Sequence, residues 1–403
     1  MFKQRNLQVL LVAGALLLCG RNRASAQDGI YADFQTSMGS FTCRLEYALA
    51  PKAVANFIGL AAGQRSWLNL ANGTAQTNAF YDGTTFHRVI AGFMIQSGSP
   101  NGFGTDGPGY AFVDEFSSSL RFNSFGMLAM ANSGPDSNGS QFFITVAPTT
   151  WLNDVHTIFG RVTGGSNVVY GISQVATDAN NKPTTNIVIQ GINIRRVGSA
   201  ALAFKIDDKG LPVVTNQPMA LATAPGGMWA LDWFTNRQYA DNRLYVSGNL
   251  FDWREDRLGI ELSTQVTNRV YRSNEVANAY YRLAQIQYAE STLAPKSLQS
   301  RLLTLNLKSA TTGNGMGTLK ITFDASGGGT YSLVDSTGTS TGTVTDYTWI
   351  QDPYRGNLRP IYYSSLVPME VRLDFTSATQ GKITGTAYAQ TSVALSGTFT
   401  LGP

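Results

Sequence analysis

Short runs in which apolar and polar residues alternate, separated by glycine-containing turns, recur along most of this 403-residue chain. Alternation with a period of two places the apolar side chains on one face of a β-strand. Glycine, present in 41 copies, supplies the tight turns between such strands. The pattern predicts a mainly β protein.

The length of the chain predicts two or three domains, because a single core rarely grows to 403 residues. Residues 29–45 read as two strands joined at Met38-Gly39, and residues 51–61 have the apolar spacing of a short amphipathic helix. A clean alternation over 187–194 closes the first domain. We place this domain at 27–198, a β-rich module with a linker at 199–302, and an antiparallel β module at 303–403. Strands in the last module are expected at 318–323, 329–334, 371–375, 381–388 and 395–401.

The first 26 residues resemble an export signal. Lys3 and Arg5 precede a short apolar run over 7–18, and Ala24-Ser25-Ala26 matches a cleavage site. We therefore expect a protein that is periplasmic or extracellular, with no transmembrane segment after cleavage. Lipidation at Cys19 is the competing interpretation, which the bulky Leu18 disfavours.

Charge and cysteine content exclude several classes. The formal net charge of +4 comes without a basic cluster, so we expect no nucleic-acid partner. After cleavage Cys43 would be the only cysteine, and its alternating neighbours predict a buried thiol on a strand. One cysteine and two separated histidines cannot form a zinc site, so neither a metal nor a cofactor is expected.

Three segments place a few polar side chains among Phe, Met, Leu and Trp, which is the composition of an apolar pocket with directed polar groups. They are residues 86–98, residues 130–144 and residues 151–162. No Ser-His-Asp set and no phosphate-binding loop accompanies them. Rotation about an X-Pro bond would suit such a site, since its barrier of about 18–20 kcal/mol arises from amide resonance. An arginine that donates to the prolyl nitrogen would weaken that resonance.

These segments, together with Tyr81-Asp82-Gly83 and residues 107–110, closely resemble the cyclophilin family of peptidyl-prolyl cis/trans isomerases over about 30–197. The resemblance implies a closed eight-stranded antiparallel β-barrel with two helices. One or two sandwich-like or barrel-like β modules would follow it. The resemblance also implies activity on proline-containing peptides or unfolded exported proteins, with cyclosporin as a candidate ligand. A non-catalytic peptide-binding module of a secreted scaffold or adhesin is the alternative.

The same resemblance assigns site residues. Catalytic roles fall to Arg88, Gln96, Phe93 and His156. Substrate-binding roles fall to Met94, Ala131, Asn132, Ser133, Gln141, Phe143, Trp151 and Leu152. We expect His156 to pack against the proline ring without transferring a proton. The chain departs from the family pattern at Ala91, Ser97 and Ser99, which puts the shape of the groove and the rate in question.

Overall fold

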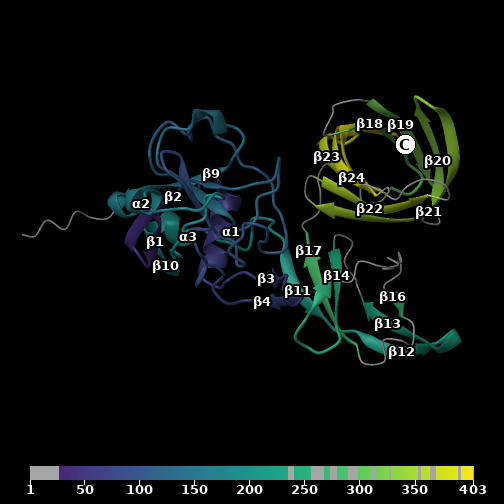
Figure 1. Ribbon diagram of the computed structural model, residues 1–403, viewed down its shortest axis with the longest axis horizontal. Helices are drawn as coiled ribbons and strands as arrows, with labels where there is room; N and C mark the ends of the chain where they lie inside the picture. Colours follow the sequence, from purple (N-terminus) through teal and green to yellow (C-terminus); the bar gives the residue numbers. More distant parts are fainter. Residues whose placement is uncertain are drawn as a thin grey trace, which may run out of the picture.

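A computed structural model describes residues 27–234, 240–255, 267–272, 279–288, 298–309, 315–325, 328–352, 355–363, 369–388 and 392–402. The expected export signal at 1–26 lies outside these residues. Figure 1 shows three parts in chain order: a unit of sheet and helices, a region of small sheets, and a barrel.

The first part is built on one eight-stranded sheet with the order β10-β1-β2-β9-β7-β8-β6-β5. Every neighbouring pair in it is antiparallel. Its strands are β1 (Gly29–Thr36), β2 (Gly39–Leu45), β5 (Arg88–Ile90), β6 (Met94–Ser97), β7 (Met127–Met130), β8 (Phe142–Thr145), β9 (Ile158–Gly164) and β10 (Ile189–Val197). The remaining elements are α1 (Pro51–Ala61), the hairpin β3 (Trp67–Asn69) and β4 (Thr74–Gln76), the 3-10 turn η1 (Thr150–Leu152), α2 (Ser166–Ser173) and α3 (Ser199–Ala203). The prediction of two helices therefore missed the short α3.

The first hairpin and the first helix form as their sequences predict. β1 and β2 pair from Ile30–Leu45 to Thr36–Gly39, and Gly39 has a φ of +119° at the turn. α1 has proline in its first turn, where a missing N–H leaves no hydrogen bond unmade. The Glu115 carboxylate accepts hydrogen bonds from the first-turn amide of Ala53 at 2.9 Å and from that of Lys52. A distant loop therefore caps this helix.

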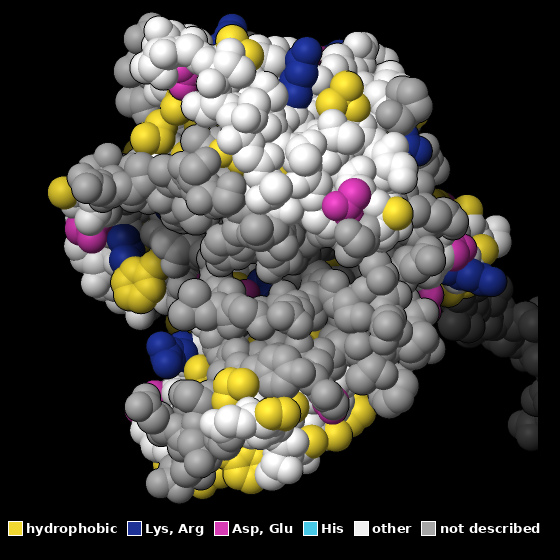
Figure 2. Space-filling view, turned by 90° about the vertical axis from the view of Figure 1, so that its right-hand side faces the viewer, with side chains coloured by type: hydrophobic (Ala, Val, Ile, Leu, Met, Phe, Trp, Pro, Cys, Tyr) yellow, Lys and Arg dark blue, Asp and Glu magenta, His cyan; other side chains and the backbone are white. Residues whose placement is uncertain are grey.

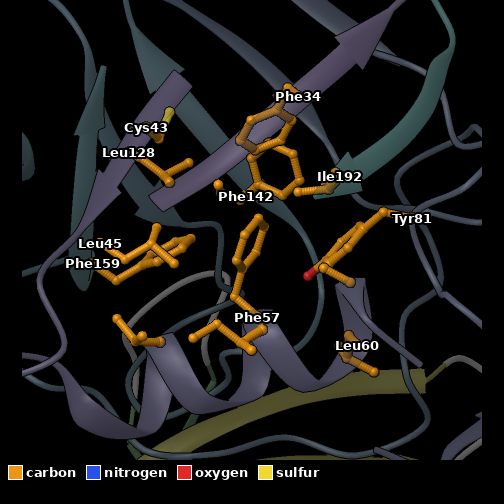
Figure 3. Packing of buried hydrophobic residues seen from close by; sticks show 14 of the residues in the cluster. Phe34, Cys43, Leu45, Phe57, Leu60, Tyr81, Leu128, Phe142, Phe159 and Ile192 are labelled. Atoms are coloured by element: carbon orange, nitrogen blue, oxygen red, sulfur yellow. The ribbon is translucent and has the colours of Figure 1, made fainter. Parts of the chain in front are cut away.

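The inner face of the sheet packs on α1. Phe57 points from the helix into a cluster of aromatic rings from several strands (Figure 3). Its ring lies 5.7 Å from that of Phe142 and 5.2 Å from that of Phe159, centroid to centroid. Cys43 is fully buried in the same core, and burial raises the pKa of its thiol, as expected for an inert strand cysteine.

The predicted closed barrel is not formed by this sheet, because its end strands β5 and β10 do not pair as a ladder. An isolated bridge joins Thr85 to Val188, and the Val89 amide donates to Asn181 O at 2.8 Å. β5 has only three residues, and irregular chain before β10 runs beside it. The sheet is thus curled but open, since a loop meets β5 where a barrel would need a strand.

The core of the first part continues beyond Gly198. Ala201, Ile206 and Leu211 are buried in the same cluster as the sheet, and Arg196 donates to the carbonyl of Phe204. The segment after β10 is therefore packed on this unit rather than being a free linker.

Two small sheets follow, with orders β11-β17-β14-β15 and β12-β13-β16. Their strands are β11 (Val213–Gln217), β12 (Ala220–Ala224), β13 (Met228–Phe234), β14 (Ala240–Ser247), β15 (Arg254–Glu255), β16 (Thr267–Arg272) and β17 (Tyr280–Gln287), with the 3-10 turn η2 at Pro225–Gly227. Trp233 is buried, and Arg282 lies 3.9 Å above the ring of Trp253. The side chains of Trp233 and Trp253 are therefore packed against neighbouring residues.

The last part is a closed barrel whose first and last strands pair, from Leu303–Leu401 to Ser309–Leu395. Its strands are β18 (Leu302–Ser309), β19 (Gly315–Phe323), β20 (Gly329–Asp335), β21 (Gly338–Asp352), β22 (Arg355–Tyr363), β23 (Met369–Ser377), β24 (Gln380–Tyr388) and β25 (Ser392–Leu401). All five strands predicted here are confirmed and are longer than expected, whereas β18, β21 and β22 were missed.

The surface at the barrel end carries no concentrated charge among its described side chains. Figure 2 shows these Lys, Arg, Asp and Glu side chains spread over this face, with acidic and basic groups side by side in places and no large patch of one sign. Among the described helices, none is long and apolar enough to cross a membrane.

Candidate active site

The candidate site lies on the outer face of the first sheet, where strand alternation separates core from surface. In β8, Phe142 and Ile144 belong to the main core, whereas Phe143 belongs to a second apolar cluster on the opposite face. β6 repeats this pattern, with Ile95 in the core and Met94 in the second cluster. Phe143, which was assigned to substrate binding, therefore lies on the face opposite to the main core.

This second cluster is the candidate apolar pocket. Its buried members are Met94, Phe122, Met127, Ala129, Phe143 and Ile158, and the half-buried Ile90, Phe93, Leu120, Ala131 and Leu152 pack against them. The structure thus brings together five of the apolar residues that were assigned to the site, namely Phe93, Met94, Ala131, Phe143 and Leu152. Trp151 stands at the rim with its side chain exposed, and its ring lies 6.0 Å from that of Phe93.

A chain of side-chain amides holds Arg88 beside this pocket. Arg88 and Gln96 are register partners in β5 and β6, and Arg88 Nη1 donates to Gln96 Oε1 at 3.3 Å. Gln96 Nε2 donates to Gln141 Oε1 at 3.0 Å. Gln141 Nε2 donates to the carbonyls of Gly104 and Asp106, both at 2.9 Å.

The orientation of the two side-chain amides, Gln96 and Gln141, is set at the end of the hydrogen-bond chain away from Arg88. Backbone carbonyls only accept hydrogen bonds, so Gln141 must turn its NH₂ toward them and its oxygen toward Gln96. Gln96 must then donate to Gln141, which leaves its own oxygen for the guanidinium of Arg88. The loop at 104–106 therefore fixes the orientation of the arginine through two amides.

His156 lies against Phe143 of this cluster. Its ring meets Phe143 edge-on, with centroids 5.2 Å apart. Nδ1 lies 3.0 Å from the carbonyl of Met130, so Nδ1 carries the proton and donates it. Burial lowers the pKa of His156, and the hydrogen bond to Met130 and the charge of Asp114 partly oppose that shift. The imidazole is thus neutral and held in one orientation at pH 7.

A polar cavity of about 500 Å³ adjoins the apolar pocket. Five predicted site residues line it, namely Gln96, Ala131, Asn132, Ser133 and Gln141. The side chain of Asn132 is engaged elsewhere, because its Nδ2 donates to Val155 O at 2.7 Å. Its backbone therefore remains the part that can meet a ligand.

Two residues that depart from the family pattern, Ser97 and Ser99, form local hydrogen bonds. The buried Ser97 hydroxyl donates to Thr85 O at 2.9 Å. The buried Ser99 hydroxyl donates to Asp106 and accepts from the Gly104 amide at 3.0 Å. Ser99 thus braces the loop that holds Gln141. Ala91 lies exposed in the turn before Gly92, which has a φ of +71°.

Two residues of the cavity wall, Arg243 and Tyr288, were not predicted from the sequence, and they come from the region of small sheets. Tyr288 extends the alternation of Ala284 and Ile286, so a shared face was visible in the sequence. No local pattern indicated which surface this face covers.

An apolar cluster beside a polar groove, with one oriented arginine nearby, suits the binding of an extended peptide that carries a compact apolar ring. Within the described residues, no three His, Cys, Asp or Glu side chains are grouped to hold a metal ion.

The comparisons with known proteins agree with this class. The family model described as cyclophilin type peptidyl-prolyl cis-trans isomerase/CLD matches residues 31–194. Peptidyl-prolyl cis-trans isomerase B of Streptomyces anulatus is 51% identical over 166 residues, which are 40% of this chain and 95% of that protein. Peptidyl-prolyl cis-trans isomerase A of Mycobacterium tuberculosis is 50% identical over 40% of this chain and 91% of its own length. A cyclophilin of Cryptosporidium parvum of known structure is 32% identical, covers 42% of this chain and 99% of its own, and has a TM-score of 0.37.

The chain belongs to the family of cyclophilin-type peptidyl-prolyl cis-trans isomerases. The predictions of the family and of the class of enzyme are thereby confirmed.

Proposed function

We propose that this protein accelerates isomerisation of X-Pro bonds in exported polypeptides through Arg88. The observation that carries the proposal is the directed chain from the loop at 104–106 through Gln141 and Gln96 to the guanidinium. It holds one donor group beside an apolar cluster of the character that a proline ring requires.

In this mechanism the proline ring occupies the pocket between Phe93, Phe143 and His156. Twisting the amide makes the prolyl nitrogen pyramidal and gives it a lone pair that can accept a hydrogen bond. Arg88 donates to that nitrogen, and this interaction is stronger in the twisted state than in the planar one. No proton is transferred, which agrees with the engaged Nδ1 of His156.

The other sequence-derived assignments belong to the same proposal. The backbone at Asn132 and the groove at Ala131, Ser133 and Gln141 would hold the peptide on either side of proline. Trp151 at the rim would contact cyclosporin. Export through the 1–26 segment would bring the catalyst to unfolded proteins outside the cytoplasm, and the appended β modules would tether or target it.

Substitution of Arg88 tests the mechanism. Arg88→Ala should lower kcat/KM on a proline peptide by about a hundredfold to a thousandfold, as for loss of one preorganised donor. Arg88→Lys should restore little, because an ammonium lacks the planar fork that Gln96 can hold. His156→Gln serves as the matched control and should reduce the rate much less. Equal losses in the arginine and histidine variants would contradict the assignment of roles.

The same assay separates the enzyme from the alternative of a non-catalytic peptide-binding module. A binding module would retain peptide affinity and show no acceleration in the unsubstituted chain. The intact set of Arg88, Gln96, Phe93 and His156 supports the enzyme.

A further inference from the structure

The loop at 99–106 presents the two backbone carbonyls on which the orientation of Arg88 depends. The carbonyls of Gly104 and Asp106 each accept a hydrogen bond from Gln141 Nε2, both at 2.9 Å. No residue of this loop belongs to a helix or a strand, and both of its glycines have a positive φ. The shape of the loop therefore depends on hydrogen bonds from its own side chains.

The carboxylate of Asp106 connects the far end of the loop to its beginning. Its Oδ1 accepts a hydrogen bond from the Ser99 hydroxyl, and its Oδ2 accepts one from the Asn101 amide at 2.9 Å. Ser99 Oγ also accepts a hydrogen bond from the Gly104 amide at 3.0 Å. Because Ser99 is fully buried, water cannot take the place of these bonds at its hydroxyl. One carboxylate and one hydroxyl thus hold both residues whose carbonyls face Gln141.

The single proton of the Ser99 hydroxyl has two acceptors within reach. One is Asp106 Oδ1 and the other is Asn101 Oδ1 at 2.8 Å. Asn101 Oδ1 already accepts a hydrogen bond from the Phe103 amide at 2.9 Å, whereas a carboxylate is the stronger acceptor. The proton of Ser99 therefore belongs to the contact with Asp106.

The base of the loop is fixed independently of Asp106. Ser140 Oγ donates to Gly98 O at 2.7 Å, and a Cβ on Gly98 would lie 2.5 Å from Ser140 O. Ser140 directly precedes Gln141 in the chain, so the loop and Gln141 start from the same point. Loss of the Asp106 carboxylate should therefore release the segment at 99–106 and leave its base in place.

We infer that Asp106 is a positioning residue for the isomerase reaction. Its carboxylate keeps the carbonyls at 104 and 106 directed at Gln141, and the amides of Gln141 and Gln96 carry that orientation to Arg88. This inference rests on the proposed function of Arg88 as the donor to the prolyl nitrogen. Asp106 also lines the polar cavity, so a direct contact with the peptide is the competing role that the experiment must exclude.

The test compares kcat and KM of the full chain and of its Asp106→Ala variant on a proline peptide. An oriented Arg88 acts on the twisted amide and not on the planar substrate, so kcat should fall while KM stays unchanged. We expect kcat to fall about fivefold, which is the factor that corresponds to one ordinary hydrogen bond. Asp106→Asn should restore part of the rate, because its carboxamide oxygen can still accept one of the two hydrogen bonds. A rise in KM with an unchanged kcat would indicate direct contact with the peptide and would overturn the inference.

A double-mutant cycle with Gln141→Leu tests whether Asp106 acts through the side-chain amides. The Gln141→Leu background interrupts the hydrogen-bond chain, so Asp106→Ala should change kcat there by less than about twofold. The same loss of kcat in both backgrounds would mean that Asp106 acts by another route, and it would reject the inference.

Asp335→Ala is the matched control, because Asp335 braces a turn of the C-terminal barrel in a similar way. Its Oδ1 accepts hydrogen bonds from the Thr337 amide at 2.7 Å and from the Thr337 hydroxyl at 2.6 Å. This variant loses the same charge and should keep kcat and KM unchanged. If Asp106→Ala does not fold, Ser99→Ala, which keeps the carboxylate and removes its contact with the hydroxyl, should lower kcat by the same route. An unchanged kcat in that folded variant would overturn the inference.

Failure of the proposed function would have a different signature. In that case the unsubstituted chain would not accelerate isomerisation, and NMR signals of the glutamine side-chain amides in the full chain would replace the rate as the readout. Asp106→Ala should shift the NH₂ signals of both Gln96 and Gln141, whereas Asp335→Ala should leave them in place. Unshifted signals of both glutamines in the Asp106 variant would overturn the inference whatever the activity.

Discussion

Replacement of Gln141 by leucine tests whether the amide chain orients Arg88. The leucine has a similar volume but removes three hydrogen bonds, one with Gln96 and two with the carbonyls at 104 and 106. Each such bond contributes about 0.5–1.5 kcal/mol net, and water can replace part of this at a half-buried site. We expect the free energy of unfolding to fall by about 1–2 kcal/mol.

The Gln141→Leu substitution should lower kcat/KM by more than its loss of stability explains. Without Gln141, the Gln96 amide is free to turn its NH₂ toward the guanidinium, where it can no longer accept a hydrogen bond. We expect kcat/KM to fall about tenfold, which corresponds to about 1.4 kcal/mol in the transition state. Gln141→Glu should be as harmful, because a carboxylate would face the two carbonyl oxygens.

A double-mutant cycle distinguishes orientation of Arg88 from a direct contact of Gln141 with the peptide. The assay is the rate of cis-to-trans conversion of a proline peptide, measured in the Arg88 and Arg88→Ala backgrounds. If Gln141 acts through Arg88, its substitution should have almost no further effect once Arg88 is alanine. A tenfold loss in both backgrounds would refute the orientation argument.

Three further predictions concern export, pH and inhibition. The exported protein should begin at Gln27, and intact-mass analysis that found a lipid on Cys19 would reject this. The rate should be flat between about pH 6 and 8. Because burial lowers the pKa of folded His156 below its unfolded value of 6.5, its contribution to stability is fully present above that value. This contribution is lost as the pH falls through the folded pKa, which thermal melting at graded pH would show. Cyclosporin should bind and change the fluorescence of Trp151, so absence of binding at tens of micromolar ligand would count against a family-like groove.

The sequence by itself determined the local elements and the two faces of the strands around the site. Period-two alternation in residues 142–144 separates Phe143 from Phe142 and Ile144, because successive side chains on a strand point to opposite faces. Proline in the first turn of α1 and glycine after its end marked the helix at 51–61. These signals act within a few residues, so they can be read without the fold.

Only the tertiary structure decided what lies opposite each face. The expected closed barrel at 27–198 is an open sheet because a loop at 181–188 reaches β5 where closure would need a strand. The closed eight-stranded barrel occurs instead at 302–401. Arg243 and Tyr288 stand at the groove because a sheet distant in sequence from Gln141 docks on the β3–β4 hairpin. Alternation shows which side chains share a face, but the partner of that face depends on shape and hydrogen bonds between distant segments.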